Sequence, residues 1–206
     1  MPSLIQHLSK EQQRELFLDL NYLNTLEFRS FCREHSIPFK IWVETGAGAR
    51  RQTRDTDRKS VVLGRIRHYL KTGRRLEATC FSARVVNSHP PPSRLRASNR
   101  LYYGWYDKTN RDMIGLLERL TDGEFRSGAI ARILAREFWT VGKAPTFNEF
   151  AKAWLLANAK GLGFHPEAAW LTDRARNEAG TDWKKKRERK AKSVLDVLAQ
   201  IESSGS

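Results

Sequence analysis

The sequence predicts an all-α protein of two small helical units joined by a proline-rich basic linker. Apolar residues recur at helical spacing in most segments of the 206-residue chain, and several of these segments begin with a capping pattern or end at a glycine. The stretch HPPPSRLRAS interrupts this pattern, because its three prolines fix φ and remove backbone donors. We therefore expect an N-terminal unit over 1–75, a linker over 76–108, a helical domain over 109–202 and a flexible tail over 203–206.

Two helices are expected near the N-terminus. Ser9 with Gln12, and Asn24 with Glu27, have the spacing of a capping box, in which each side chain satisfies a backbone donor at the start of a helix. The following stretch SIPFKIWVE is expected to be extended, because Pro38 disfavours a helical conformation in the residue before it.

A basic loop and a third helix are expected next. The stretch TGAGARRQTR, residues 45–54, has no apolar period and predicts a mobile loop. In contrast, DTDRKSVVLGRIRHYLKTG, residues 55–73, carries an apolar stripe at helical spacing. We expect Asp55 or Asp57 to cap this helix and Gly73 to end it.

The second half of the chain predicts further helices, in the segments NRDMIGLLERL, EFRSGAIARILAREFWTVG, TFNEFAKAWLLANAKG, HPEAAWLTDRARNEAG and DWKKKRERKAKSVLDVLAQIE. Thr146 with Glu149 again has capping-box spacing. Trp139, Trp154 and Trp170 lie in apolar helical stripes, so we expect them to pack in the core.

The charge of the chain indicates a polyanionic partner. The formal net charge is +14, and the region from Glu44 to Arg75 contains ten Lys and Arg residues against three acidic ones. A run of charge is often only a solvated helix face, but the shortage of acidic residues here favours contact with nucleic-acid phosphates. The predicted DNA-binding residues are Arg50, Arg51, Arg54, Arg58, Lys59, Arg65, Arg67, Lys71, Arg74 and Arg75.

Two further basic segments are candidates for secondary nucleic-acid contacts. The alternatives are that KKKRERKAK is only a soluble helix end, and that the aromatic residues of SRLRASNRLYYGWYDK pack the linker instead of stacking on unpaired bases. The residues concerned are Arg94, Arg96, Arg100, Lys184, Lys185, Lys186 and Arg187.

The arrangement over residues 22–73 resembles the SAP module, a small helix–extended–helix DNA-binding unit, in a bacterial variant. The residues that carry the resemblance are Leu26, Phe31 and Cys32 in the first helix, Lys59, Val62, Arg65 and Ile66 in the second, and Tyr69 to Gly73 at its end. The sequence departs from the family at Ser36, where a glycine is usual, and in a connection that is longer than the usual short turn.

Residues 120–172 resemble a helical domain of uncharacterised function that often follows this bacterial SAP variant. The matching positions are Phe138, Gly142, Phe147, Asn148, Phe150, Trp154, Asn158 and Gly161. This second resemblance implies an association of domains and no mechanism.

The sequence predicts no enzyme, cofactor or metal site. There is no phosphate-binding GxxxxGK[ST] loop, and Cys32 and His35 have no second pair at zinc-ligand spacing. The two cysteines form no disulfide framework, which favours a cytoplasmic protein, nucleoid-associated if bound to DNA, and no apolar run is long enough to span a membrane.

We therefore expect a non-enzymatic protein that binds double-stranded DNA, mainly through the phosphate backbone. The alternatives are an RNA- or single-strand-binding protein, an adaptor or regulator related to phage or defence systems, and a metal-dependent nuclease. A further alternative is that the C-terminal helical domain binds a protein partner.

Overall fold

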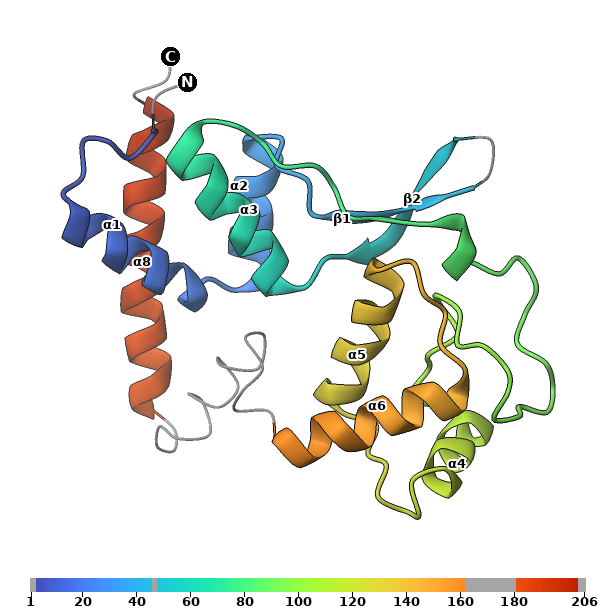
Figure 1. Ribbon diagram of the computed structural model, residues 1–206. Helices are drawn as coiled ribbons and strands as arrows, with labels where there is room; N and C mark the ends of the chain where they lie inside the picture. The colour runs from blue at the N-terminus through green and yellow to red at the C-terminus, as the bar shows by residue number, and fades with distance from the viewer. Residues whose placement is uncertain (1–2, 46–47, 162–180, 204–206) are drawn as a thin grey trace. The chain divides into compact units, whose positions relative to one another are not determined.

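The computed structural model describes residues 3–45, 48–161 and 181–203, and the chain divides into two compact units. Unit 1 comprises Met1–Lys40, Thr56–Ala78 and Trp170–Ser206, and unit 2 comprises Ile41–Asp55 and Thr79–Ala169. The described residues form seven α-helices and a three-stranded mixed sheet (Figure 1). The prediction of an all-α fold is therefore wrong, and the fold is mixed α/β.

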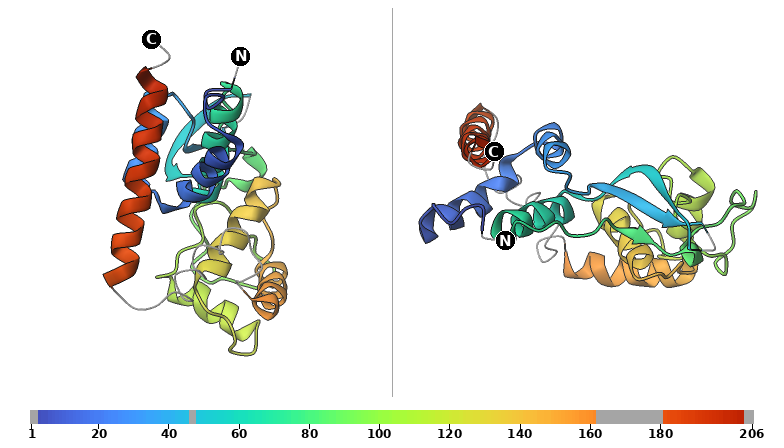
Figure 2. Two further views of the ribbon diagram at one scale, coloured as in Figure 1. Left: turned by 90° about the vertical axis from the view of Figure 1, so that its left-hand side faces the viewer. Right: turned by 90° about the horizontal axis from the view of Figure 1, so that it is seen from above.

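Unit 1 is helical and is built from both ends of the chain. Its elements are α1 (Lys10–Asp19), the 3-10 turn η1 (Leu20–Tyr22), α2 (Thr25–Glu34), α3 (Lys59–Thr72) and α8 (Thr181–Ser203). Figure 2 shows α8 as a long helix, and it packs against α1 and η1. Its buried Val194 and Leu198 join Leu20, Phe28 and Ile66 in one core. The helix expected at the end of the second domain thus belongs to unit 1.

The ends of the helices follow the local sequence closely, with one exception. The capping boxes at Ser9 and Asn24 are both present, and α3 ends at Gly73, whose φ of 65° is left-handed. Neither Asp55 nor Asp57 caps α3. Arg58 occupies the N-cap position with no side-chain cap hydrogen bond.

Asp57 instead forms a buried ion pair with Arg65 of α3. Arg65 Nη1 lies 2.6 Å from Asp57 Oδ2 and also donates to the Pro38 carbonyl at 3.0 Å. The Asp57 amide donates to the carbonyl of Phe39 at 2.9 Å. One guanidinium therefore joins α3 to the two chain segments that lead into and out of the β1–β2 hairpin.

The sheet contains β1 (Lys40–Glu44), β2 (Arg50–Thr56) and β3 (Cys80–Phe81), in the order β2-β1-β3. β1 alternates in burial, with Ile41 and Val43 facing the core, and runs parallel to β3. β2 is the charged edge strand at the place where a basic loop was expected. Its amide groups pair with β1 although its side chains have no apolar period, and charged side chains are typical of an edge strand.

Unit 2 completes its core with three helices. These are α4 (Arg111–Arg119), α5 (Ala129–Thr140) and α6 (Phe147–Lys160), the last with the expected capping box at Thr146. Trp139 and Trp154 are buried as expected, whereas Trp170 and the segment HPEAAWLTDRARNEAG lie outside the described residues.

Part of the segment expected to be a linker is built into unit 2. Phe81, Val85 and Leu101 are buried in its core, and Val85 ends the 3-10 turn η2 (Ala83–Val85). The Leu101 amide donates to the carbonyl of Pro145 at 2.7 Å. The prolines at 90–92 are exposed and lie in a segment without helix or strand, but they do not separate two domains. No helix in the described ranges has the length and apolar character needed to cross a bilayer.

The Arg65–Asp57 pair gives the first prediction. Arg65→Met leaves a buried carboxylate without its partner, and we expect the free energy of unfolding to fall by about 3–5 kcal/mol, as is typical when one member of a buried ion pair is removed. Denaturant unfolding measures this change. Arg74→Met, at an exposed site just after α3, is the control and should change stability by less than about 0.5 kcal/mol. Equal stability of Arg65→Met and wild type would contradict the assignment.

Candidate nucleic-acid interface

A hollow lined by several positive charges lies in unit 1, between α1 and α3. Lys10, Arg14 and Phe17 lie at helical spacing on α1 and face Arg67 and Lys71 of α3 across a groove of about 460 Å³. We call this the α1–α3 groove. Its other described lining residues are Gln13 and Leu18, so none of the described residues that line it is acidic.

Phe17 contacts both of the α3 cations that line the groove. Its carbonyl accepts hydrogen bonds from Nε and Nη2 of Arg67, at 3.3 and 3.0 Å. Its ring lies beneath the Lys71 ammonium, 4.8 Å from the ring centroid. Burial lowers the pKa of Arg67, but a guanidinium stays protonated at neutral pH. Phe17 therefore contacts both of these cations at the groove.

Two acidic residues of α1 lie on a different side of the helix. Glu15 and Asp19 line a hollow beside Val194 of α8, and Asp19 accepts a hydrogen bond of 2.8 Å from Lys190. Lys10 and Arg14 therefore lie toward α3, whereas Glu15 and Asp19 lie toward α8.

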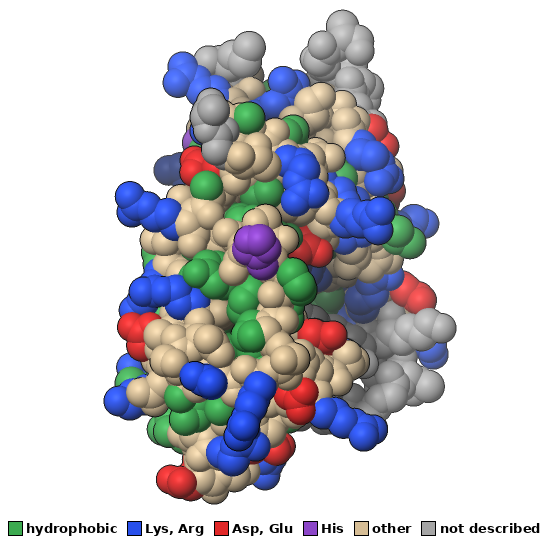
Figure 3. All heavy atoms as spheres, turned by 90° about the vertical axis from the view of Figure 1, so that its right-hand side faces the viewer, with side chains coloured by type: hydrophobic (Ala, Val, Ile, Leu, Met, Phe, Trp, Pro, Cys, Tyr) green, Lys and Arg blue, Asp and Glu red, His purple; other side chains and the backbone are tan. Residues whose placement is uncertain are grey.

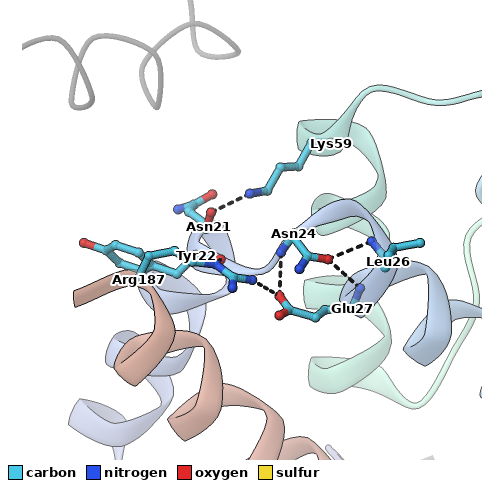
Figure 4. Close-up of polar contacts among 7 residues, drawn as sticks. All are labelled: Asn21, Tyr22, Asn24, Leu26, Glu27, Lys59 and Arg187. Carbon is cyan, nitrogen blue, oxygen red and sulfur yellow. Dashed lines mark hydrogen bonds and ion pairs between the residues drawn. The ribbon is translucent and has the colours of Figure 1, made fainter. Parts of the chain in front are cut away.

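Several predicted DNA-binding cations are instead used inside unit 1 (Figure 4). Lys59 Nζ donates to the carbonyl of Asn21 at 2.5 Å. Arg187 donates to the carbonyl of Tyr22 at 3.0 Å and pairs with Glu27, the residue that completes the Asn24 capping box. Through these hydrogen bonds, the two cations join α3 and α8 to the turn before α2. The buried Arg65 likewise donates to Asp57 and to the Pro38 carbonyl, so these three predicted residues each have an intramolecular acceptor.

The β2 arginines form a separate basic segment in unit 2. Arg50, Arg51 and Arg54 are exposed, and the alternation of a strand places Arg50 and Arg54 on one face and Arg51 on the other. Figure 1 shows the β1–β2 hairpin extending away from α5 and α6. On the face shown in Figure 3, Lys and Arg side chains are spread among acidic and hydrophobic ones. The described residues of the hairpin therefore offer exposed cations on both of its faces.

The remaining predicted residues are mostly exposed. Arg58 is half-buried, Arg75 Nε donates to the His35 carbonyl at 2.7 Å, and Arg100 Nη1 donates to the Ala144 carbonyl at 2.9 Å. The side chain of Lys184 lies outside the described residues. The other exposed members of the set are Arg74, Arg94, Arg96, Lys185 and Lys186.

The sequence interpretation missed Lys10 and Arg14. Their spacing of one helical turn was visible in the sequence, but Glu11 and Glu15 alternate with them and balance their charge locally. Only the packing of α3 on one side of α1 and α8 on another shows which charges face the groove.

No metal or thiol chemistry is indicated in the described part of the chain. Its His, Cys, Asp and Glu side chains form no group of three or more that could hold a metal ion. Cys32 is fully buried, and burial raises the pKa of its thiol to about 12. His35 packs between the rings of Phe31 and Tyr69. The Cys32–His35 pair therefore belongs to the core of unit 1.

Lys59 gives a prediction on pH dependence. Burial, and next the charge of Arg187, lowers its pKa from 10.5 to about 8. The unfolded chain therefore binds more protons than the folded one between these pH values, and stability should rise as pH increases through this window. We expect Lys59→Met to lose this rise.

Denaturant unfolding at several pH values between 8 and 10.5 measures the effect. Lys71→Met, which removes an exposed lysine from the same helix, is the control and should keep the wild-type slope. Parallel pH profiles for wild type and Lys59→Met would contradict the lowered pKa.

Comparison with known proteins identifies no relative of this chain. No protein-family model matches the chain, and no curated protein or solved structure is significantly similar to it. The function proposed for the α1–α3 groove therefore depends on the charges and contacts of its own residues.

Proposed function

We propose that this is a non-enzymatic DNA-binding protein whose α1–α3 groove contacts the phosphate backbone of double-stranded DNA. The observation that carries the proposal is the meeting of Lys10, Arg14, Arg67 and Lys71 from two helices around one groove, with no acidic residue among its described lining. Phosphates neutralised by these cations release condensed counterions, which is the main source of sequence-independent affinity for DNA.

The geometry of the groove suits a backbone contact. Arg67 is oriented by the Phe17 carbonyl through Nε and Nη2, and a guanidinium has five donors, so others are left for a phosphate. Lys10 and Arg14 are exposed and line the groove from α1. Phosphate contacts fix position but carry no base sequence information. The proposed binding is therefore weakly dependent on sequence.

The resemblance to a SAP module belongs to the same proposal. α2 and α3 are joined by an extended segment, and α3 supplies two of the four groove cations. The long connection that departs from the family is the β1–β2 hairpin. We propose that its exposed Arg50, Arg51 and Arg54 are a second backbone contact, and that the protein acts in the cytoplasm on nucleoid DNA.

The prediction concerns the two groove cations that have no structural role in unit 1. We expect the double variant Lys10→Ala/Arg14→Ala to bind duplex DNA more weakly, because two phosphate contacts are lost. The slope of log K against log salt concentration should become shallower by about 0.9 for each lost contact. Fluorescence anisotropy with a labelled duplex, repeated over a salt series, measures both quantities.

The matched control is Lys152→Ala/Lys160→Ala, which removes two exposed cations from α6 of unit 2. It makes the same change in net charge and should leave the salt slope close to that of wild type. Circular dichroism verifies that each variant folds. The same affinity and slope in a folded Lys10→Ala/Arg14→Ala variant as in wild type would overturn the assignment of the groove.

A further inference from the structure

Unit 2 contains a second hollow that the proposed duplex contact does not use. It has a volume of about 230 Å³ and lies between the end of β2, the segment at 103–106 and α5. We call it the α5 pocket. The lining residues that matter for its chemistry are Asp55, Tyr103, Tyr106, Arg132, Arg136 and Trp139.

One wall of the α5 pocket is aromatic and held in place. Tyr103 and Trp139 meet edge to face at 5.4 Å, with an angle of 86° between their rings. The Trp139 indole N–H donates to the Leu101 carbonyl at 3.0 Å, and the Tyr103 hydroxyl donates to the Asp55 carboxylate. This wall is therefore preorganised, which reduces the entropy lost when a planar ligand binds.

The other wall carries positive charge. Arg132 and Arg136 are separated by one turn of α5, so their side chains project from the same face of the helix. Burial and the bond to Asp55 raise the pKa of Tyr103 to about 12, and burial also raises the pKa of Tyr106. Both phenols are thus neutral donors at physiological pH. The described residues that line the pocket include two guanidinium groups and one carboxylate.

We propose that the α5 pocket binds one nucleoside monophosphate unit, with its phosphate at Arg132 and Arg136 and its base against the aromatic wall. The Asp55 carboxylate has acceptor sites beyond the one that Tyr103 uses, so it can accept a hydrogen bond from an exocyclic amino group of the base. The volume lies below the usual range of about 300–1,000 Å³ for drug-sized ligands, which favours a single nucleotide over a dinucleotide.

This inference is independent of the duplex contact, because all residues of the pocket belong to unit 2. It also assigns a ligand-binding role to the tyrosines at 103 and 106 and to Trp139. The proposed contact with the DNA backbone does not use these residues. The nucleotide can come from solution or from an unpaired position in a strand. Both sources present the same phosphate and base, and the experiment separates them.

The experiment titrates the full chain with dAMP, dCMP and TMP by isothermal calorimetry. Deoxyadenosine and inorganic phosphate are the two halves of the ligand, and each should bind at least about tenfold more weakly than dAMP, since each lacks one set of contacts. Arg132→Ala/Arg136→Ala should weaken dAMP binding by about tenfold or more. The control Arg111→Ala/Arg119→Ala removes two exposed arginines from α4 and should bind like wild type.

The role of Asp55 is tested by Asp55→Asn, which keeps an acceptor for Tyr103. Wild type should prefer dAMP and dCMP to TMP, which lacks an exocyclic amino group, and the variant should lose much of this preference. Binding of inorganic phosphate as tight as that of dAMP, or dAMP binding unaffected by Arg132→Ala/Arg136→Ala, would overturn the proposal.

A single-stranded tetradeoxyadenylate identifies the source of the nucleotide. Tighter binding of this strand than of dAMP, lost in Arg132→Ala/Arg136→Ala, indicates an unpaired nucleotide within a strand, and tighter binding of dAMP indicates a free nucleotide. The salt slope for duplex DNA should be unchanged in the pocket variants and reduced in Lys10→Ala/Arg14→Ala. These measurements therefore distinguish a wrong assignment of the α5 pocket from a wrong assignment of the duplex contact.

Discussion

The buried pair between Arg65 and Asp57 is the interaction on which the chain's path depends. Arg65 also holds the carbonyl of Pro38, so one side chain of α3 fixes the positions at which the β1–β2 hairpin leaves unit 1 and returns to it. An unpaired carboxylate or guanidinium buried in the core is strongly destabilising, so the pair stabilises this arrangement of the three segments. The hairpin can then be long and charged without disturbing the packing of α2 against α3.

The cations of unit 1 divide into two groups with different roles. Lys59 and Arg187 donate to backbone carbonyls at the turn before α2, and Arg187 also pairs with Glu27. Their charge is used to join α3 and α8 to that turn. Arg67 and Lys71 lie at the α1–α3 groove, where they meet the cations of α1. The cations of unit 1 therefore include some that form internal contacts and others that line the α1–α3 groove.

The sequence identified the helices of unit 1 and most of their ends, because capping boxes at Ser9 and Asn24 and a left-handed residue at Gly73 are local features. It missed the edge strand β2, because that strand's pairing is supplied by β1 and its own side chains show no apolar alternation. It missed Lys10 and Arg14 because nearby acidic residues conceal them in a count of charge.

What the sequence by itself determined is therefore the helical periodicity, the caps and the excess of positive charge. The tertiary structure decided which Lys and Arg side chains contact a distant carbonyl or carboxylate, as Lys59, Arg65 and Arg187 do. It likewise assembled the α5 pocket from Asp55, the tyrosines at 103 and 106, and α5, which are far apart along the chain. Spacing within one helix is a local property, whereas the pairing of charges and the formation of a pocket depend on contacts between distant segments.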